Sequence, residues 1–392
     1  MFFVDEPYVS PFFKATVRDH GIPVVDTPAA RRAGLLPGTR LLGEREAVQA
    51  AREGGVRRVY TTSENAIGWI AEHLAFTPLP DRIDRFKNKV RFRQLTRPLF
   101  PDLFFRGIPA GDLPDVRFED LPAPLVLKPA VGFFSVGVRR VEDAGAWAEA
   151  VAAVGSELDR ARGLYPDPVL DGRSFIVEQC IDGEEFAVDA YFDAEGAPVV
   201  LSILKHLFAS DADVSDRVYV TSAEIIEENL APFTGFLERL GAQTGVRDLP
   251  VHVELRRGPD GALVPIEVNP LRFGGWCTTA DLTALAYGLN PYVCYWEGRR
   301  PHWPTALAGK TGKMYALVVL DNATGLDGGE IAAFDYEGLL ATFERPLELR
   351  RLDHRAHPVF GFLFTETRAD NVGELERVLH SDLREFMVVG AR

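Results

Sequence analysis

Hydrophobic positions near the start of the chain fall in short apolar runs separated by longer amphipathic stretches. Residues 2–4, 22–25 and 56–61 predict strands, and stretches that begin at Ser10 and Glu64 predict helices. Gly21 is expected to end the first of these helices. Alternating strands and helices are typical of a small parallel sheet with covering helices. The first 80 or so residues are therefore expected to form an α/β domain.

From Leu125 onward the apolar runs lengthen and the pattern changes. Residues 125–127, 175–177, 185–192, 314–320 and 360–365 predict strands. Residues 144–154, 223–240 and 372–386 predict helices, and Gly241 is expected to end the second of them. Pro-rich polar segments near residues 77–81 and 109–124 predict domain boundaries.

Composition and charge narrow the class of protein. The chain has 392 residues, of which 46% are hydrophobic, enough to build a core shared by two or three sub-domains. The formal charge is −14 without a long Lys or Arg run, which disfavours nucleic acid as a partner. Three scattered cysteines indicate neither disulfides nor structural zinc. No apolar stretch approaches the ~18 residues that span a bilayer, and the acidic start lacks a targeting signal, so we expect no membrane association and a cytoplasmic location.

The most informative pattern is a hairpin around the turn sequence at residues 258–261, Gly-Pro-Asp-Gly. Because strand side chains alternate between faces, His252 and Glu254 share a face of the first strand. Glu267 and Asn269 share a face of the second strand for the same reason. Two carboxylates and an amide oxygen on one rigid face would suit Mg²⁺. A solvated hairpin face is the alternative interpretation.

Whether these four side chains meet depends on the length of the hairpin loop. A loop of two or four residues sets Glu254 opposite Pro265 and His252 opposite Glu267. All the polar side chains then converge on one face. A three-residue loop would flip one strand and separate them.

A second pattern places a lysine at the end of the apolar run 125–127. The ammonium of Lys128 could contact a phosphate there, and Gly132 and Gly137 would let backbone N–H groups approach the same anion. The segment is not a Walker loop, because no Gly-Lys-Ser/Thr follows. Taken alone, this segment favours an ordinary turn over a phosphate-binding loop.

A third pattern covers residues 175–189, where an apolar strand breaks at a polar turn and then resumes. Such a hinge could offer backbone groups to an adenine edge, and Glu185 could accept hydrogen bonds from ribose hydroxyls. Alone, this segment could be any hairpin.

Together these patterns resemble the ATP-grasp superfamily over roughly residues 86–290. They occur in the family's order, which is the lysine, the glycine loop, the Glu-x-x-Ile hinge, Gly-Glu-Glu and the closing Glu … Glu-x-Asn. The resemblance implies an α/β ATP-grasp fold with a small pre-ATP-grasp domain at residues 1–85. It places the ATP-grasp domain at residues 86–300, with a lid near residues 120–183, and a C-terminal α/β extension at residues 301–392.

The resemblance also implies a set of site residues. Lys89 stands where the family has its first ATP-contacting lysine, with Lys87 as the competing choice. The other implied nucleotide contacts are Lys128, Gly132, Ser135, Gly137, Glu178, Gln179, Ile181 and Glu185. The implied metal ligands are Glu254, Glu267 and Asn269, and Arg272 lies where the family often has an arginine that steadies the acyl phosphate. Apart from the resemblance, Lys205, His206 and His252 are candidates to line the cleft and assist catalysis, with a solvated strand end and a structural histidine as the alternatives. The family commonly has Asn-x-Arg, whereas this chain has one more residue between Asn269 and Arg272.

The implied activity is that of a carboxylate–amine ligase that uses ATP and Mg²⁺, with Mn²⁺ as an alternative metal, and releases ADP and phosphate. Its expected partners are a small-molecule carboxylate and an amine, such as an amino acid, a small peptide or a related metabolite. Dimers are common in the family, so a homodimer is an open alternative. A bicarbonate-activating or phosphoryl-transfer enzyme, or a nucleotide-binding module without turnover, are the competing interpretations.

Overall fold

The computed structural model describes residues 1–132, 137–161, 171–210, 213 and 215–390. The chain forms two compact units, each assembled from distant segments of the sequence. The first comprises Met1–Gly183, Ala190–Val199 and Thr234–Cys277, and the second comprises Glu184–Asp189, Val200–Phe233 and Thr278–Arg392. The division into three consecutive parts at residues 85 and 300 stays a prediction.

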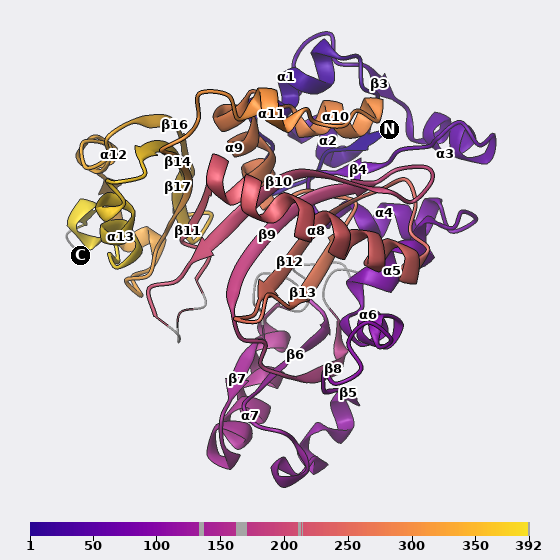
Figure 1. Ribbon diagram of the computed structural model, residues 1–392, viewed down its shortest axis with the longest axis vertical. Helices are drawn as coiled ribbons and strands as arrows, with labels where there is room; N and C mark the ends of the chain where they lie inside the picture. Colours follow the sequence, from indigo (N-terminus) through magenta and orange to yellow (C-terminus); the bar gives the residue numbers. More distant parts are fainter. Residues whose placement is uncertain (133–136, 162–170, 211–212, 214, 391–392) are drawn as a thin grey trace. The chain divides into compact units, whose positions relative to one another are not determined.

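A four-stranded parallel sheet opens the first unit, in the order β3-β2-β1-β4 (Figure 1). Its strands are β1 (Phe2–Phe3), β2 (Val24–Val25), β3 (Leu41–Leu42) and β4 (Tyr60–Thr61). The helices are α1 (Pro11–Asp19), α2 (Pro28–Arg32), α3 (Glu44–Arg52), α4 (Ala66–His73), α5 (Leu79–Lys87) and α6 (Lys89–Thr96). The predicted α/β start of the chain is therefore confirmed.

Local sequence explains the first helix. The hydroxyl of Ser10 accepts a hydrogen bond from the Phe13 backbone N–H at 3.0 Å, and Pro11 occupies the first helical position. Phe13 then stacks on Phe2, with ring centroids 6.2 Å apart, which anchors the helix to the sheet.

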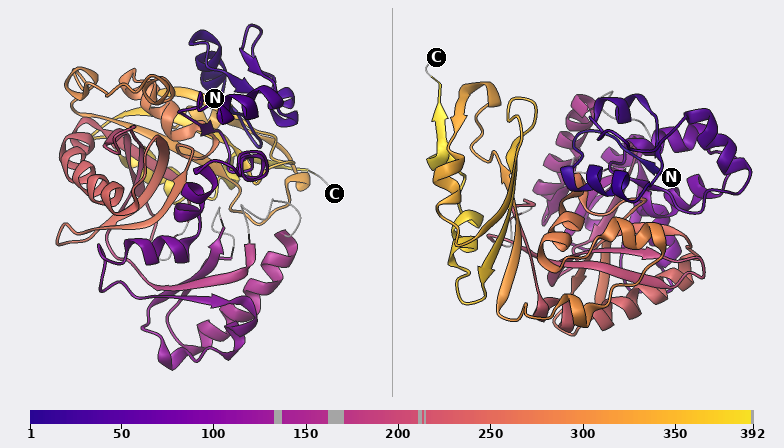
Figure 2. Two further views of the ribbon diagram at one scale, coloured as in Figure 1. Left: turned by 90° about the vertical axis from the view of Figure 1, so that its right-hand side faces the viewer. Right: turned by 90° about the horizontal axis from the view of Figure 1, so that it is seen from above.

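A second sheet in this unit has the order β5-β8-β6-β7, and its neighbouring strands are antiparallel (Figure 1). The left view of Figure 2 shows this part of the chain in magenta from another side. The strands are β5 (Phe105–Pro109), β6 (Leu125–Val131), β7 (Arg139–Val141) and β8 (Asp171–Gln179). Short 3-10 turns, η1 (Ala110–Asp115) and η2 (Phe118–Asp120), follow β5, and helix α7 (Ala144–Ala161) follows β7. Apolar side chains of β6, including Leu125 and Leu127, share one buried cluster with Trp147 of α7, so the helix covers a face of the sheet.

The first unit is completed by the hairpin of β12 (Leu249–Arg257) and β13 (Leu263–Pro270), and by the 3-10 turn η3 (Gly275–Cys277). Three elements are divided between the units: β9 (Glu184–Phe192), β10 (Pro198–Leu207) and α8 (Ala223–Thr244). The prediction that Gly241 ends α8 is wrong, because the helix continues to Thr244 and Gly245 follows with φ +64°. Gly241 instead makes room for a neighbour, since a Cβ there would lie 2.7 Å from the ring of Phe192.

The second unit is built on an antiparallel run of strands in the order β10-β11-β14-β17-β16 (Figure 1). The added strands are β11 (Val218–Ser222), β14 (Lys313–Asp321), β16 (Pro346–Arg351) and β17 (Val359–Arg368), and β15 (Ile331–Phe334) pairs with β18 (Met387–Val389). The helices are α9 (Thr278–Tyr287), α10 (Pro291–Glu297), α11 (Trp303–Ala306), α12 (Tyr336–Leu340) and α13 (Gly373–Leu379), with 3-10 turns η4 (Gly328–Glu330) and η5 (Arg384–Phe386). The predicted last helix is therefore shorter than expected. Of the residues described, none lies in a helix both long and apolar enough to cross a membrane.

Candidate functional site

The hairpin of β12 and β13 brings four predicted site residues onto one face. Glu254 lies directly opposite Glu267, and His252 lies directly opposite Asn269. Directly opposed residues of an antiparallel pair share a face, so all four side chains converge. His252 Nε2 lies 3.6 Å from Glu254 Oε1. The predicted convergence is present in the structure.

The register that produces this convergence differs from the predicted one. Glu254 was expected opposite Pro265 and His252 opposite Glu267, whereas each partner lies two residues further along β13. The loop between the strands has five residues, which alone would turn Glu267 away. A β-bulge at Ile266, which has no partner residue on β12, adds one residue and restores the face.

Lys89 lies against Glu267, one of the two metal-ligand candidates of β13. Its ammonium is 2.9 Å from a carboxylate oxygen of Glu267, and the amide nitrogen of Asn269 donates to the other oxygen at 2.8 Å. Burial raises the pKa of the Glu267 carboxyl, but the neighbouring ammonium groups, first that of Lys89, hold this pKa well below its usual range. Glu267 is thus ionised, as a metal ligand must be.

Glu178 joins two further buried cations. Its carboxylate forms ion pairs with Lys128 of β6 and with Arg93 of α6, the latter at 2.7 Å, and all three side chains are at least 94% buried. Burial raises the pKa of Glu178, but Lys128 and Arg93 together lower it to about 2. The Glu178 side chain therefore has a structural partner on each side.

A third carboxylate, Glu64, was not predicted as a site residue. It forms an ion pair with Lys87 and accepts hydrogen bonds from Arg272 Nε and Nη2 at 3.0 and 2.8 Å. Burial raises the pKa of Glu64, but Lys87 and Arg272 outweigh burial and lower it overall. Leu271, in the left-handed conformation at φ +68°, takes up the additional residue that precedes Arg272.

Lys87 of α5 and Lys89 of α6 also contact Gly132, where the glycine loop begins. Lys87 Nζ donates to the carbonyl oxygen of Gly132 at 3.0 Å, and Lys89 Nζ approaches the same oxygen at 3.4 Å. Gly137 has φ +71°, a conformation that disfavours side chains. Ser135 lies outside the described residues.

The remaining hinge residues make contacts within the first unit. The side-chain oxygen of Gln179 accepts a hydrogen bond from the Phe104 N–H at 2.9 Å. The carbonyl oxygen of Ile181 accepts one from Arg256 at 2.7 Å. These contacts fix the end of β8 and the turn that follows it, the segment expected to face adenine.

Three predicted residues lie in the second unit. His206 Nδ1 is 3.0 Å from Glu185, and its Nε2 is 2.9 Å from the carbonyl oxygen of Ser215 and therefore donates to it. Lys205 forms an ion pair with Glu184. Lys205 and His206 are neighbours on β10, so their side chains point to opposite faces. Since His206 contacts Glu185, it is His206 and not Lys205 that shares a face with Glu185.

The donor set of the β12–β13 face fits magnesium. Among the described residues no group of three or more His, Cys, Asp or Glu side chains is arranged to hold a metal ion. Glu254 and Glu267 supply two carboxylates, with side chains 31% and 19% exposed, and Asn269 supplies an amide. Mg²⁺ commonly takes one or two carboxylates and completes its shell with water and substrate phosphates, so this face fits a metal delivered with a nucleotide.

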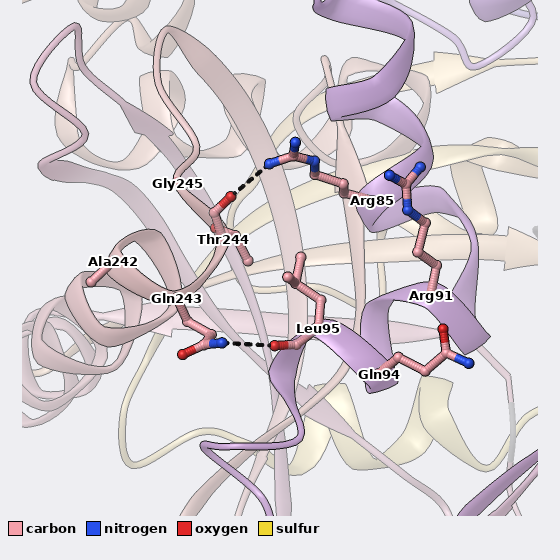
Figure 3. Close-up of a pocket in the computed structure, with 8 residues that line it drawn as sticks. All are labelled: Arg85, Arg91, Gln94, Leu95, Ala242, Gln243, Thr244 and Gly245. Atoms are coloured by element: carbon pink, nitrogen blue, oxygen red, sulfur yellow. Dashed lines mark hydrogen bonds between the residues drawn. The ribbon is translucent and has the colours of Figure 1, made fainter.

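A cavity of about 620 Å³ elsewhere in the first unit has a different character (Figure 3). It is lined by Arg85, Arg91, Gln94, Leu95, Ala242, Gln243, Thr244 and Gly245, and contains no predicted nucleotide or metal contact. Arg85 pairs with Asp81 and donates to the carbonyl oxygen of Thr244 at 3.0 Å. Arg91 forms ion pairs with Asp81 and Asp84, so both guanidinium groups are already neutralised.

Comparison with known proteins decides the family of the central region. Residues 121–280 match the family model of the ATP-grasp domain. This region is an ATP-grasp domain. No curated protein matches the chain. The predicted resemblance to the ATP-grasp superfamily is therefore confirmed.

Solved structures extend this ATP-grasp likeness to the whole chain. An L-amino acid ligase from Bacillus licheniformis superposes with a TM-score of 0.72 at 20% identity, covering 100% of this chain and 98% of that one. N5-carboxyaminoimidazole synthase from Aspergillus clavatus gives 0.62 at 15% identity, with 98% of each chain covered. Biotin carboxylase from Campylobacter jejuni gives 0.61 at 13% identity, covering 99% and 92%. At these identities the likeness shows the fold, and the predicted α/β ATP-grasp fold is confirmed.

Two residues of the cluster around this ATP-grasp site escaped the sequence analysis. Glu64 contacts Arg272 across 208 positions of sequence, and no local pattern signals such a pairing. Arg93 had a weak signal, because it lies four residues after Lys89 and so on the same side of α6. Pro265 was a second signal, since proline inside a strand is confined to edges and bulges.

Proposed function

We propose that the protein is an ATP-dependent carboxylate–amine ligase that acts with Mg²⁺ and releases ADP and phosphate. The observation that carries this proposal is the contact of Lys89 with Glu267, opposite Glu254, where both carboxylates belong to the region that matches the ATP-grasp domain. The overall likeness to an L-amino acid ligase supports an amino acid or small peptide as a substrate. Other solved structures of this fold are complexes with ADP or with magnesium and ADP.

In this proposal the buried cations of the first unit bind the nucleotide phosphates. Lys89 and Lys128 are the proposed phosphate contacts, because Lys89 pairs with Glu267, and Lys128, like Lys87, acts electrostatically on the same carboxylate. Glu254, Glu267 and Asn269 would hold Mg²⁺, which neutralises charge on the phosphates as the phosphoryl group moves. Gly132 and Gly137 flank the loop proposed to cover them.

The choice between Lys87 and Lys89 follows from their partners. Lys87 is paired with Glu64, which Arg272 also binds, and its ammonium acts on Glu267 electrostatically as well. Lys89 is paired with Glu267 itself. We therefore assign the phosphate contact to Lys89 and a supporting role to Lys87.

The proposed chemistry needs no enzyme nucleophile. An oxygen of the substrate carboxylate attacks the γ-phosphorus, and the bond to ADP breaks, giving an acyl phosphate. The amine then attacks the acyl carbon, phosphate leaves, and the amine loses a proton to solvent or a nearby base. Arg272, held by two hydrogen bonds to Glu64, is preorganised to stabilise the acyl phosphate.

Ribose binding and proton handling have further candidate residues, each proposed from its own contacts. Glu185 is the proposed ribose contact, and His206 orients its carboxylate through the 3.0 Å contact. His252, beside Glu254, is a candidate proton carrier near the metal face. Lys205 is the weakest candidate, because its side chain is 31% exposed and paired with Glu184.

Product analysis tests this function directly. The purified protein is incubated with ATP, Mg²⁺ and pooled amino acids, and the nucleotide products and new amides are identified by mass spectrometry. We expect ADP and phosphate to appear in step with an amide when both substrates are present. Formation of AMP and pyrophosphate would reject the acyl-phosphate route.

Bicarbonate is a second candidate substrate for the same phosphoryl transfer. One solved structure of this fold, the biotin carboxylase domain of a 2-oxoglutarate carboxylase from Hydrogenobacter thermophilus, contains MgADP and bicarbonate and superposes with a TM-score of 0.60. ADP release that depends on bicarbonate but not on any amino acid would favour this alternative.

A further inference from the structure

Arg93 is a buried arginine whose guanidinium group binds three acceptors from two other segments. Its side chain is only 2% exposed, and Nε donates to Glu178 at 2.7 Å. Nη1 donates to the carbonyl oxygen of Pro265 at 2.7 Å, and Nη2 donates to that of Ile266 at 3.3 Å. Helix α6 is thereby tied both to the end of β8 and to β13.

The two carbonyl groups bound by Arg93 belong to the bulge of β13. A bulge leaves an extra residue outside the regular ladder, and a buried carbonyl without a partner is costly. Pro265 has no N–H to give to the ladder, which also favours an irregularity at this point. Arg93 therefore supplies the hydrogen bonds that the interrupted ladder does not.

The bulge decides which way the metal-ligand candidates face. On the loop side of the bulge, Arg257 is opposite Leu263 and Leu255 is opposite Pro265. If this register continued, Glu254 would lie opposite Ile266, and Glu267 would point to the other face. With the bulge in place, Glu254 lies opposite Glu267.

We propose that Arg93 is a positioning residue that holds the β13 bulge and so aims Glu267 and Asn269 at the metal. This inference rests on the proposed function only for the identity of the bound metal. The effect of Arg93 on the register of β13 does not depend on that function. Loss of a residue that orients metal ligands typically lowers metal affinity about 10–100-fold.

Lysine at this position separates the two roles of Arg93. An ammonium group keeps the charge beside Glu178 but lacks the planar fork that reaches two carbonyl groups at once. Arg91→Lys is the matched control, because Arg91 lies on the same helix with a side chain 40% exposed and pairs with the exposed Asp81 and Asp84. Arg93→Gln is a second variant, which keeps amide donors and removes the charge.

The first measurement is hydrogen exchange in the metal-free protein. We expect Arg93→Lys to speed exchange of the peptide covering β13 about tenfold or more, with little change in the parallel sheet of β1 to β4. Arg91→Lys should leave β13 as in the wild type. Unchanged β13 exchange in both Arg93 variants, or a uniform increase over the whole chain, would overturn the proposal.

The second measurement is binding of Mn²⁺, followed by electron paramagnetic resonance, in the presence of ADP. We expect Arg93→Lys to weaken Mn²⁺ binding about 10–100-fold while ADP binding in EDTA stays within about twofold of the wild type. Equal losses in both titrations would mean a collapsed nucleotide site and would count against positioning. If the wild type binds no Mn²⁺ with ADP, the proposed function fails, and hydrogen exchange alone still decides the role of Arg93 in the register of β13.

Discussion

Glu254 lies directly opposite Glu267 on the β12–β13 hairpin, so two carboxylates face each other across neighbouring strands. Like charges in this arrangement destabilise a sheet unless a cation lies between or beside them. We predict that ADP with Mg²⁺ stabilises the protein more than ADP with EDTA does. At a Mg²⁺ concentration of 100 times its Kd for the ADP-bound protein, Mg²⁺ should raise the free energy of unfolding by about 2.7 kcal/mol over that with ADP and EDTA. Denaturant titration measures this difference.

Glu267→Gln should abolish the difference between Mg²⁺ and EDTA in that experiment. Glu337→Gln, at an exposed position in the first turn of α12, serves as the control and should keep the full difference. A Glu267→Gln variant that still responds to Mg²⁺ like the wild type would remove this carboxylate from the metal site.

Lys87 and Lys89 should behave differently when each is replaced by methionine. Lys89→Met removes the proposed phosphate contact, so KM for ATP should rise about tenfold or more. Lys87→Met leaves the buried Glu64 with Arg272 but without its ammonium partner, and should lower the free energy of unfolding by about 3 kcal/mol. Steady-state kinetics and urea titrations on both variants check this pairing. The reverse result would exchange the roles of the two lysines.

The hairpin shows how far sequence patterns lead in this protein. Period-two alternation correctly placed His252, Glu254, Glu267 and Asn269 on shared faces, because that periodicity is a local property of strands. The register was wrong, because it depends on a five-residue loop and a bulge whose effects on the face cancel. The signal of Pro265 was present but was not used.

Long-range partners were beyond the sequence analysis. A run of charged residues such as that from Arg85 to Arg93 usually forms a solvated helix face, yet Lys87, Lys89 and Arg93 are 4%, 9% and 2% exposed. Their burial requires carboxylates that arrive from segments far away in sequence, such as Glu178. Only the assembled fold supplies those partners.

Gly137 provides a test of the glycine loop. Alanine there would hold a left-handed backbone at φ +71°, and its Cβ would lie 3.2 Å from Pro129. The substitution should destabilise the backbone conformation at Gly137 by about 1–2 kcal/mol. Because Gly137 borders the loop proposed to cover the phosphates, KM for ATP should rise. Gly111→Ala, where a Cβ would meet nothing within 4 Å, should leave KM unchanged. Equal KM values for the two variants would argue against a role of Gly137 in ATP binding.

Acid stability reports on Glu178. Its pKa falls from an ordinary value of 4.5 to about 2 in the folded chain, with Lys128 and Arg93 lowering it against the effect of burial. A depressed carboxyl pKa contributes stability that is fully present above pH 4.5 and is lost as pH falls toward 2. The shift corresponds to about 3 kcal/mol at neutral pH.

Glu178→Gln should therefore unfold at lower denaturant than the wild type at pH 7, and the gap between the two should close between about pH 4.5 and pH 2. The measurement is a series of urea titrations at fixed ionic strength. Glu119→Gln, at an exposed side chain of η2, is the control and should track the wild type at every pH. A gap that stays constant from pH 7 to pH 2 would show that Glu178 contributes through packing rather than through its charge.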